Sequence, residues 1–159
     1  MTADLPPEDL IIRPARAADL PAIVGLLAND PLGQIRERDE TPLPDAYARA
    51  FAAIDADPNN EVVVAEHDGA VIGTLQITVI INLTYQGGRR AQIEGVRVAE
   101  SYRSRGIGQV LFNWAIDRAR ARDCHMMQLT ADKTRPDAHR FYESFGFTAS
   151  HVGMKLHLD

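Results

Sequence analysis

Two apolar stretches joined by Asp68-Gly69 constrain the fold more than any other feature of the sequence. Asp-Gly favours the positive φ angles of a two-residue β-turn, and strand-forming residues flank it at Glu61 to His67 and Ala70 to Ile81. Apolar side chains alternate along the second stretch from Val71 to Ile81, which is the period of a strand with one face on a core. The sequence therefore predicts an antiparallel β-hairpin with one side packed against the core.

The next stretch, Arg89 to Val98, changes face part-way along. Its apolar residues stand at odd positions up to Ile93 and at even positions from Val96. A strand can move its apolar face only where an extra residue is inserted, and glycine tolerates the backbone of such an insertion. We therefore predict a β-bulge at Glu94-Gly95. A strand buried on both faces is the alternative interpretation, because it would also lose the alternation.

The remaining elements alternate between strand and helix, which is typical of one α/β domain. The length fits a single domain over residues 1–159, with its core at about 10–158. We expect a mixed, mostly antiparallel sheet of six to seven strands and about four helices. In chain order the further elements are a strand at Leu10 to Arg13, a helix capped by Asp19, a helix after Asp45, a helix from Gly106 to about Arg122, a strand at Met126 to Thr130, a helix capped by Thr134 that stops at Gly146, and strands at Phe147 to Ser150 and Val152 to Leu158.

Charge and composition exclude several classes of protein. The chain has 17 basic and 22 acidic residues and a net charge of −5, so we expect neither a nucleic acid nor a membrane surface as partner. No apolar run is long enough for a signal peptide or a membrane-spanning helix. The one cysteine, Cys124, excludes an intramolecular disulfide and fits a cytoplasmic protein. The five histidines show no metal-ligand spacing, so we expect no metal.

The segment Arg103 to Gly108 follows a strand and opens a helix. Free N–H groups at a helix start attract anions, and here two glycines allow a close approach while two arginines add positive charge. The segment is therefore a candidate phosphate-binding loop; a glycine-rich turn with solvated arginines is the alternative. A Walker A loop is excluded because no Gly-Lys-Ser/Thr is present. A dinucleotide-binding protein is a less favoured alternative, because Leu111 replaces the required small residue although Asp132 stands where a ribose-binding acid would fall.

Two motifs and the order of the elements resemble the GNAT family of acetyl-CoA-dependent N-acetyltransferases. The motifs are R-x-x-G-x-G at Arg103 to Gly108 and the segment Ala138-His139-Arg140-Phe141-Tyr142-Glu143-Ser144-Phe145-Gly146-Phe147, and the resemblance covers nearly the whole chain. It implies a single GNAT-like domain whose central strand pair is splayed. It also implies that the coenzyme contacts Val96, Arg97 and Val98 along the opened strand, and Arg103, Ser104, Arg105, Gly106, Ile107 and Gly108 at its pyrophosphate. Many members carry Asn where this chain has Arg135, so the contact made by that Asn is not expected here.

The reaction implied by the resemblance is direct transfer of acetyl from acetyl-CoA to a primary amine of a small molecule or protein, without a metal. A lysine-like amine must lose a proton first, which costs about 4.6 kcal/mol at pH 7. Glu94, at the expected bulge, is our candidate base, directly or through water; an exposed strand glutamate is the alternative. Tyr142 is the candidate hydrogen-bond donor to the thioester sulfur, and a core tyrosine is the alternative.

The sequence leaves the acceptor and the assembly open. Four acids between Asn29 and Pro44, namely Asp30, Glu37, Asp39 and Glu40, would suit a cationic amine, but Arg36 and Arg38 balance them in part. The two strands expected near the C-terminus could pair across a two-fold axis and form a homodimer. A non-catalytic acyl-CoA-binding sensor module is the alternative to an enzyme, and release of free coenzyme A when amines are added separates the two.

Overall fold

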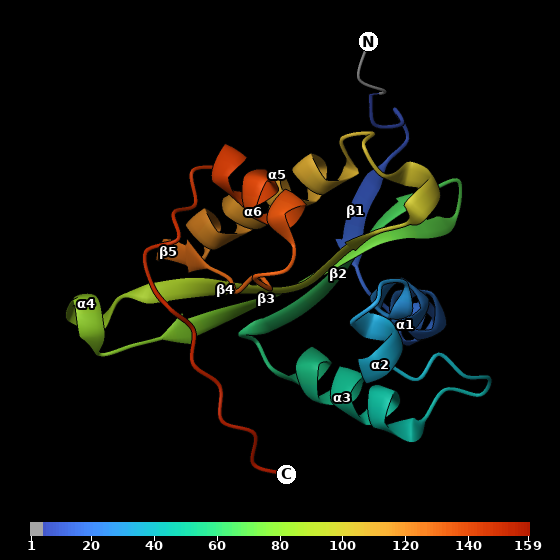
Figure 1. Cartoon of the computed structure of the whole chain (residues 1–159), viewed down its shortest axis with the longest axis horizontal. Coiled ribbons are helices and arrows are strands. Elements are labelled where there is room, and N and C mark those ends of the chain that lie inside the picture. The colour runs from blue at the N-terminus through green and yellow to red at the C-terminus, as the bar shows by residue number, and fades with distance from the viewer. Residues whose placement is uncertain (1–4) are drawn as a thin grey trace.

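A computed structural model describes residues 5–159, and within them five strands form one mixed sheet in the order β1-β2-β3-β4-β5 (Figure 1). Neighbouring strands run antiparallel from β1 to β4, whereas β4 and β5 are parallel. The strands are β1 (Ile11–Pro14), β2 (Asn60–His67), β3 (Ala70–Ile81), β4 (Arg89–Val98) and β5 (Cys124–Gln128). The hairpin prediction is confirmed: His67 pairs with Ala70, and Asp68 and Gly69 have φ angles of 49° and 74°.

Helices cover both faces of the sheet (Figure 1). One face carries α1, α2 and α3, and the opposite face carries α5 and α6. The helices are α1 (Leu20–Ala28), α2 (Gly33–Arg36), α3 (Asp45–Ala56), the single turn α4 (Thr84–Gly87), α5 (Ile107–Ala121) and α6 (Pro136–Ser144), with 3-10 turns η1 (Ala17–Asp19) and η2 (Glu100–Tyr102). None of the helices in residues 5–159 combines the length and apolar character needed to cross a membrane.

The larger core lies between the sheet and α5. Leu111 and Phe112 of α5 are fully buried there and pack with Leu75 and Ile77 of β3. A smaller cluster under α1 covers the other face, so β3 is buried on both sides at residues 72–75. From Leu75 to Ile80 buried and partly buried residues alternate, as predicted. Thr74 is 2% exposed, and its hydroxyl donates to the Val63 carbonyl at 2.8 Å. This hydrogen bond is why a polar residue is tolerated between two apolar layers.

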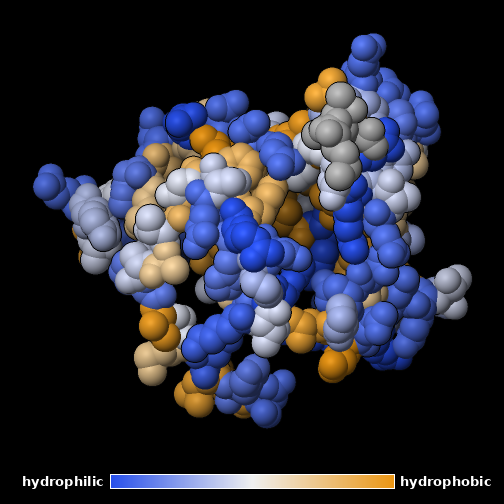
Figure 2. Space-filling model, turned by 45° about the horizontal axis from the view of Figure 1, so that its top comes forward, coloured by the Kyte–Doolittle hydropathy of each residue, from blue (hydrophilic) through white to orange (hydrophobic). Residues whose placement is uncertain are grey.

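The expected strands at Phe147 to Ser150 and Val152 to Leu158 are wrong: within the described chain this segment forms no ladder. It runs away from the sheet, and hydrophobic side chains protrude near the lower border of the space-filling view, where the segment projects (Figures 1 and 2). Alternation makes a stretch able to form a strand, but a strand needs a partner edge. The described sheet therefore has five strands and not six to seven, and six helices replace the expected four because α2 and α4 are single short turns.

Two predicted helix caps differ from the structure. Thr134 does not cap α6: its hydroxyl donates to Asp132 at 2.6 Å, and Arg135 occupies the cap position. Asp19 does stand at the N-cap position of α1, as predicted, but its carboxylate accepts from the Arg16 N–H at 2.7 Å, in the 3-10 turn before α1, and makes no cap hydrogen bond to α1 itself. In both cases the side chain forms a hydrogen bond with another group close by in the chain, as short polar residues readily do.

Candidate functional site

The predicted bulge in β4 is confirmed. Gln76 of β3 faces Glu94, but two residues earlier on β3 Thr74 faces Arg97. Two residues of β4, Gly95 and the next, therefore oppose one residue of β3. Gly95 has φ of +63°, which lies in the left-handed region that glycine adopts without strain.

Beyond the bulge β4 and β5 separate. Their ladder ends where Gln92 pairs with Gln128, whereas β4 continues to Val98 beside β3 alone. In the described chain the carbonyl of Val96 accepts from Arg97 Nη1 at 2.8 Å, and that of Val98 accepts from Arg103 Nε at 3.4 Å. Flexible guanidinium groups thus occupy carbonyls on the part of β4 that β5 does not reach. This part of β4 is an open strand edge, as the predicted splay required.

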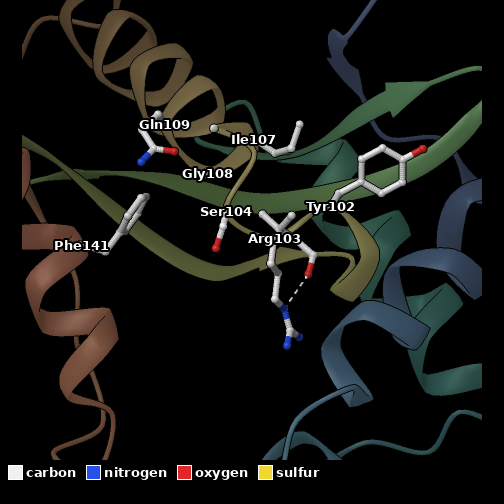
Figure 3. Close-up of a pocket in the computed structure, with 9 residues that line it drawn as sticks. Tyr102, Arg103, Ser104, Ile107, Gly108, Gln109 and Phe141 are labelled. Atoms are coloured by element: carbon white, nitrogen blue, oxygen red, sulfur yellow. Dashed lines mark hydrogen bonds between the residues drawn. The ribbon is translucent and has the colours of Figure 1, made fainter. Parts of the chain in front are cut away.

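A cavity of about 270 Å³ lies where this open edge meets the start of α5 (Figure 3). Gly106 is the N-cap residue of α5, with φ of +78°, and the first helical bond runs from Val110 N to its carbonyl at 3.1 Å. The N–H groups of Ile107, Gly108 and Gln109 come before that bond, so they are free for a ligand. The cavity is lined by Val98, Tyr102, Arg103, Ser104, Gly106, Ile107, Gly108, Gln109 and Phe141. This geometry suits an anion such as a diphosphate.

Three lining residues, Tyr102, Gln109 and Phe141, were not predicted to belong to the site. Phe141 reaches the cavity because Gly108 has no side chain: a Cβ there would lie 3.1 Å from the Phe141 ring. Gln109 could have been found from the sequence, since it is the third residue of the helix and its N–H is free by position. Phe141 could not be found in this way, because no local sequence feature indicates that α6 packs against α5.

Three residues predicted to touch the coenzyme do not line this cavity: Val96, Arg97 and Arg105. The Arg105 guanidinium stacks 5.0 Å above the Tyr102 ring, and within residues 5–159 its Nε is buried without a partner. Arg97 Nε lies 3.0 Å from Asp30 Oδ2, which joins the bulge to the turn between α1 and α2. Burial alone would raise the pKa of Asp30, but a hydrogen bond from Gly33 N–H and the charges of Arg97 and Arg135 hold it below its usual value.

The two predicted catalytic residues lie on different elements, Tyr142 on α6 and Glu94 on β4. Tyr142 of α6 packs in an aromatic cluster, with its ring centre 5.4 Å from that of Phe112. Burial raises the pKa of Tyr142, although the charges of Arg135 and Arg97 oppose the change, so the hydroxyl stays protonated at neutral pH. Glu94 is exposed on β4 directly opposite Gln76, and cross-strand neighbours share a face.

That face holds a second cavity of about 180 Å³, between α1, α3 and the bulge. Its walls are mostly apolar, and Gly95 and Gln76 form its floor at the sheet. Tyr47 lines it too, and its hydroxyl donates to Glu37 at 2.7 Å, which ties the loop after α2 to α3. This cavity could not be predicted from the sequence, because its walls come from segments far apart in the chain. From the sequence alone, the stretch from Asn29 to Pro44 is a candidate rim of a binding cleft, with a plain solvated loop as the favoured alternative; no residue of it lines this cavity, and Glu37 contacts the wall only through the Tyr47 hydroxyl.

Two further features of the structure concern a dinucleotide-binding fold and a metal site. Leu111 fills the space against β3, where a Cβ on Gly73 would lie 3.1 Å from it; it does not permit the close helix–strand approach of a dinucleotide fold. Among the described residues, one group of possible metal ligands comes together, namely Asp9, His67 and Asp68. His67 Nδ1 lies 2.7 Å from Asp9. The two residues are 58 positions apart in the chain, so the spacing of the histidines could not predict this group.

Comparison with known proteins agrees with this architecture. A model of the acetyltransferase (GNAT) family matches residues 29–147. Aminoalkylphosphonate N-acetyltransferase of Salmonella typhimurium is 31% identical over 106 residues, which cover 67% of this chain and 68% of that protein. Glucosamine 6-phosphate N-acetyltransferase of Trypanosoma brucei brucei is 31% identical over 91 residues, 57% of this chain and 59% of that protein.

Among solved structures, one described as a transcriptional regulator from Bacillus halodurans C-125 is 53% identical. It superposes with a TM-score of 0.91 and covers 94% of this chain and 99% of that one. The family match spans more than half of the sequence and includes the bulge, the cradle at α5 and Tyr142. The chain is therefore an acyltransferase that belongs to the GNAT family of acetyltransferases.

Proposed function

We propose that this protein transfers acetyl from acetyl-CoA directly to the primary amine of a small molecule. The observation that carries the proposal is the open edge of β4 next to the cradle at α5. The β4–β5 ladder stops at Gln92, and the cavity begins at Val98. A coenzyme A thioester suits both features, because its diphosphate needs free N–H donors and its amide-bearing arm can add to a strand edge.

The residues present fit the coenzyme in detail. The N–H groups of Ile107 and Gly108 would hold the diphosphate, and the exposed Arg103 side chain would add charge. The carbonyls of Val96 and Val98 would accept from the amides of the pantetheine arm once Arg97 and Arg103 release them. Arg105, held on Tyr102, and Ser104 would contribute backbone N–H groups. The bound thioester supplies an activated acetyl group.

In the transfer step the amine nitrogen attacks the thioester carbonyl, the carbon–nitrogen bond forms and the carbon–sulfur bond breaks. Glu94 accepts the proton of the ammonium, directly or through one water. Tyr142 donates a hydrogen bond to the departing sulfur, a role that its raised pKa supports because the hydroxyl keeps its proton. The thiolate is less basic than a tyrosinate, so a hydrogen bond suffices and complete proton transfer is not required.

We propose an amine that also carries an acidic group as the acceptor. Two of the acidic residues that would suit a cationic amine already have partners within the chain. Asp30 pairs with Arg97, and Glu37 accepts from the Tyr47 hydroxyl. Arg135 and Arg97 both act on Tyr142 through their charge, and Asp30 already pairs with Arg97, so Arg135 is the guanidinium group left near the expected thioester for an acidic group. The relatives from Salmonella and Trypanosoma are named for acceptors with a phosphonate and a phosphate. Arginine binds such groups through paired hydrogen bonds.

Release of free coenzyme A from acetyl-CoA tests the function. Matched amines should be compared that differ only in a phosphonate, phosphate or carboxylate, together with polyamines and a lysine peptide. We expect thiol release with the acidic small amines and little with their uncharged counterparts. Faster reaction of polyamines or of the peptide would contradict the acceptor class, and tight acetyl-CoA binding without thiol release from any amine would contradict turnover.

A second candidate function is ligand-dependent regulation. It is favoured by the 53% identical structure, which is described as a transcriptional regulator. A sensor would use the same cradle and splayed strands to bind an acyl-CoA but would not need Glu94 or Tyr142. Substituting these two residues would then leave the response to acyl-CoA intact, whereas an enzyme would lose its turnover.

A further inference from the structure

Residues 5–10, which precede β1, lie beside the loop that leads into α5 (Figure 1), and we call them the N-terminal strap. Two consecutive prolines, Pro6 and Pro7, restrict the backbone of the strap. At its end the Leu10 N–H donates to the Pro7 carbonyl at 3.2 Å, and the Leu10 side chain packs against the larger core. The strap is therefore fixed to the body of the protein where it joins β1.

The first contact of the strap is with Gly106, the N-cap residue of α5. A Cβ on Gly106 would lie 3.1 Å from Pro6 Cδ, so the proline ring packs against the glycine backbone. Gly106 has a φ of +78°, and its conformation sets the direction in which the free N–H groups at the start of α5 point. Because glycine has more backbone freedom than any other residue, Pro6 restrains a part of the cradle that would otherwise be free to move.

The second contact runs through His67 to Tyr102, at the other end of the same loop. His67 Nδ1 lies 2.7 Å from Asp9 Oδ1 of the strap, and His67 Nε2 lies 3.4 Å from Asp68 Oδ2. The His67 ring meets the Tyr102 ring nearly edge-on, with the ring centres 5.6 Å apart. Tyr102 lines the cavity and carries the Arg105 guanidinium over its ring. Asp9 thus fixes the imidazole that supports Tyr102.

The loop between these two contacts has a backbone that needs support. Ser104 has a φ of +62°, in the left-handed region that residues other than glycine rarely adopt, and Gly106 follows with a φ of +78°. Such conformations persist only where the surrounding structure holds them. Pro6 contacts one end of the loop, and Asp9 acts on the other end through His67 and Tyr102. The strap therefore contributes to holding both ends.

We propose that the N-terminal strap positions the loop from Tyr102 to Gly106 for the diphosphate of the coenzyme, with Pro6 and Asp9 as positioning residues. This inference rests on the proposed function, because the ligand that it invokes is acetyl-CoA. A loop that is ordered before binding loses less conformational entropy when the ligand arrives, so the strap raises the affinity without touching the coenzyme. The gain is confined to ligands that reach the loop, and a thioester that lacks the diphosphate does not benefit.

Two thioesters separate positioning of the loop from a general effect on stability. S-acetylpantetheine carries the acetyl group and the amide-bearing arm but no diphosphate. We expect Asp9→Ala and Pro6→Gly each to weaken acetyl-CoA binding by about 5- to 20-fold in calorimetry, and to change kcat/KM for S-acetylpantetheine by less than about twofold. Glu8→Ala is the matched control, because it removes the same charge from an exposed side chain of the strap. Unchanged acetyl-CoA binding, or equal losses with both thioesters, would overturn the positioning role.

Further variants test whether Asp9 acts through His67. Asp9→Asn keeps an oxygen that can accept from the His67 ring, so it should retain more affinity for acetyl-CoA than Asp9→Ala. His67→Phe keeps a ring against Tyr102 but loses the hydrogen bond, and adding Asp9→Ala to it should cause no further loss. Losses that add in full would refute the route through His67. An unsubstituted chain that does not bind acetyl-CoA would instead contradict the proposed function, together with the strap that rests on it.

Discussion

The inner edge of β4 and the outer edge of β5 are both open within residues 5–159, but they are bordered by different chemistry. Beside the β4 edge lie the free N–H groups at Gly106 and the arginines 97 and 103, which suit a small anionic ligand. Beside the β5 edge lies a segment of exposed apolar side chains from Val152 to Leu158, which suits apolar contacts and not an anion. An open edge alone does not identify its partner; the residues beside it do.

The largest expected effect tests the β4 side. Gly106→Trp should weaken acetyl-CoA binding about a thousandfold or more, because Gly106 lines the 270 Å³ cavity and holds the start of α5 in place, and calorimetry measures it. Gly69→Trp is the control for positive φ, with nothing within 4 Å of its Cβ position, whereas a Cβ on Gly106 would also lie 3.1 Å from Pro6. Both changes introduce backbone strain of roughly 1–2 kcal/mol, so circular dichroism of the Gly106→Trp chain should first show that it is folded. If the two variants bind acetyl-CoA equally well, the cradle is not the ligand site.

Tyr142→Phe should lower kcat by about tenfold to a thousandfold and leave the KM for acetyl-CoA nearly unchanged, because only the hydroxyl is lost. The raised pKa of Tyr142 adds a pH criterion. The donor is protonated below its pKa, so its contribution should persist across the neutral range and disappear only above about pH 10. Steady-state rates from pH 6 to about 10 check this, with Tyr85→Phe as a control at an exposed tyrosine. An unaltered kcat would make Tyr142 a packing residue alone.

The bulge and the cradle beside it were both visible in the sequence. The bulge could be predicted from the change of face between Ile93 and Val96 together with Gly95, which tolerates the inserted residue. The cradle at Gly106 could be predicted because a helix start carries its own free donors. Both depend on residues close together in the chain, where sequence spacing and spatial distance agree.

Features that depend on distant segments could not be predicted. The strand pattern of Val152 to Leu158 was correct as a pattern, but whether it forms a strand depends on an edge that it does not itself contain. The pairing of Asp30 with Arg97 joins segments 67 positions apart, and it occupies one of the acids that would have suited a cationic amine. Thr134 was expected to cap α6, but its hydroxyl donates to the Asp132 carboxylate instead.

Arg135 tests the small-molecule side of the comparison. Arg135→Ala should raise the KM for a phosphonate- or phosphate-bearing amine by about 10- to 100-fold, which corresponds to one lost charged hydrogen bond of roughly 1.5–3 kcal/mol. The KM for an uncharged amine should change little. Arg120→Ala, at a side chain that is 76% exposed on α5, serves as the control. Equal losses for charged and uncharged amines would show that Arg135 does not bind the acidic group.

The smallest expected effect concerns a region that is complete within one chain. Arg13 donates to both carboxylate oxygens of Asp19, at 2.8 and 2.9 Å, and these bonds hold the pKa of Asp19 below its usual value. Asp19→Asn should lower the free energy of unfolding by about 1–3 kcal/mol at pH 7. Because the pKa is lowered in the folded state, this contribution is present above about pH 4 and is lost as the pH falls through the folded pKa.

Urea unfolding of Asp19→Asn and of the unsubstituted chain, at several pH values from 7 to about 3, should therefore converge toward acid. Asp117→Asn, at a side chain that is 80% exposed, should show neither the loss nor the convergence. An Asp19→Asn chain that kept the full pH dependence of the unsubstituted chain would show that the Arg13–Asp19 pair, which joins β1 to the turn before α1, does not supply it.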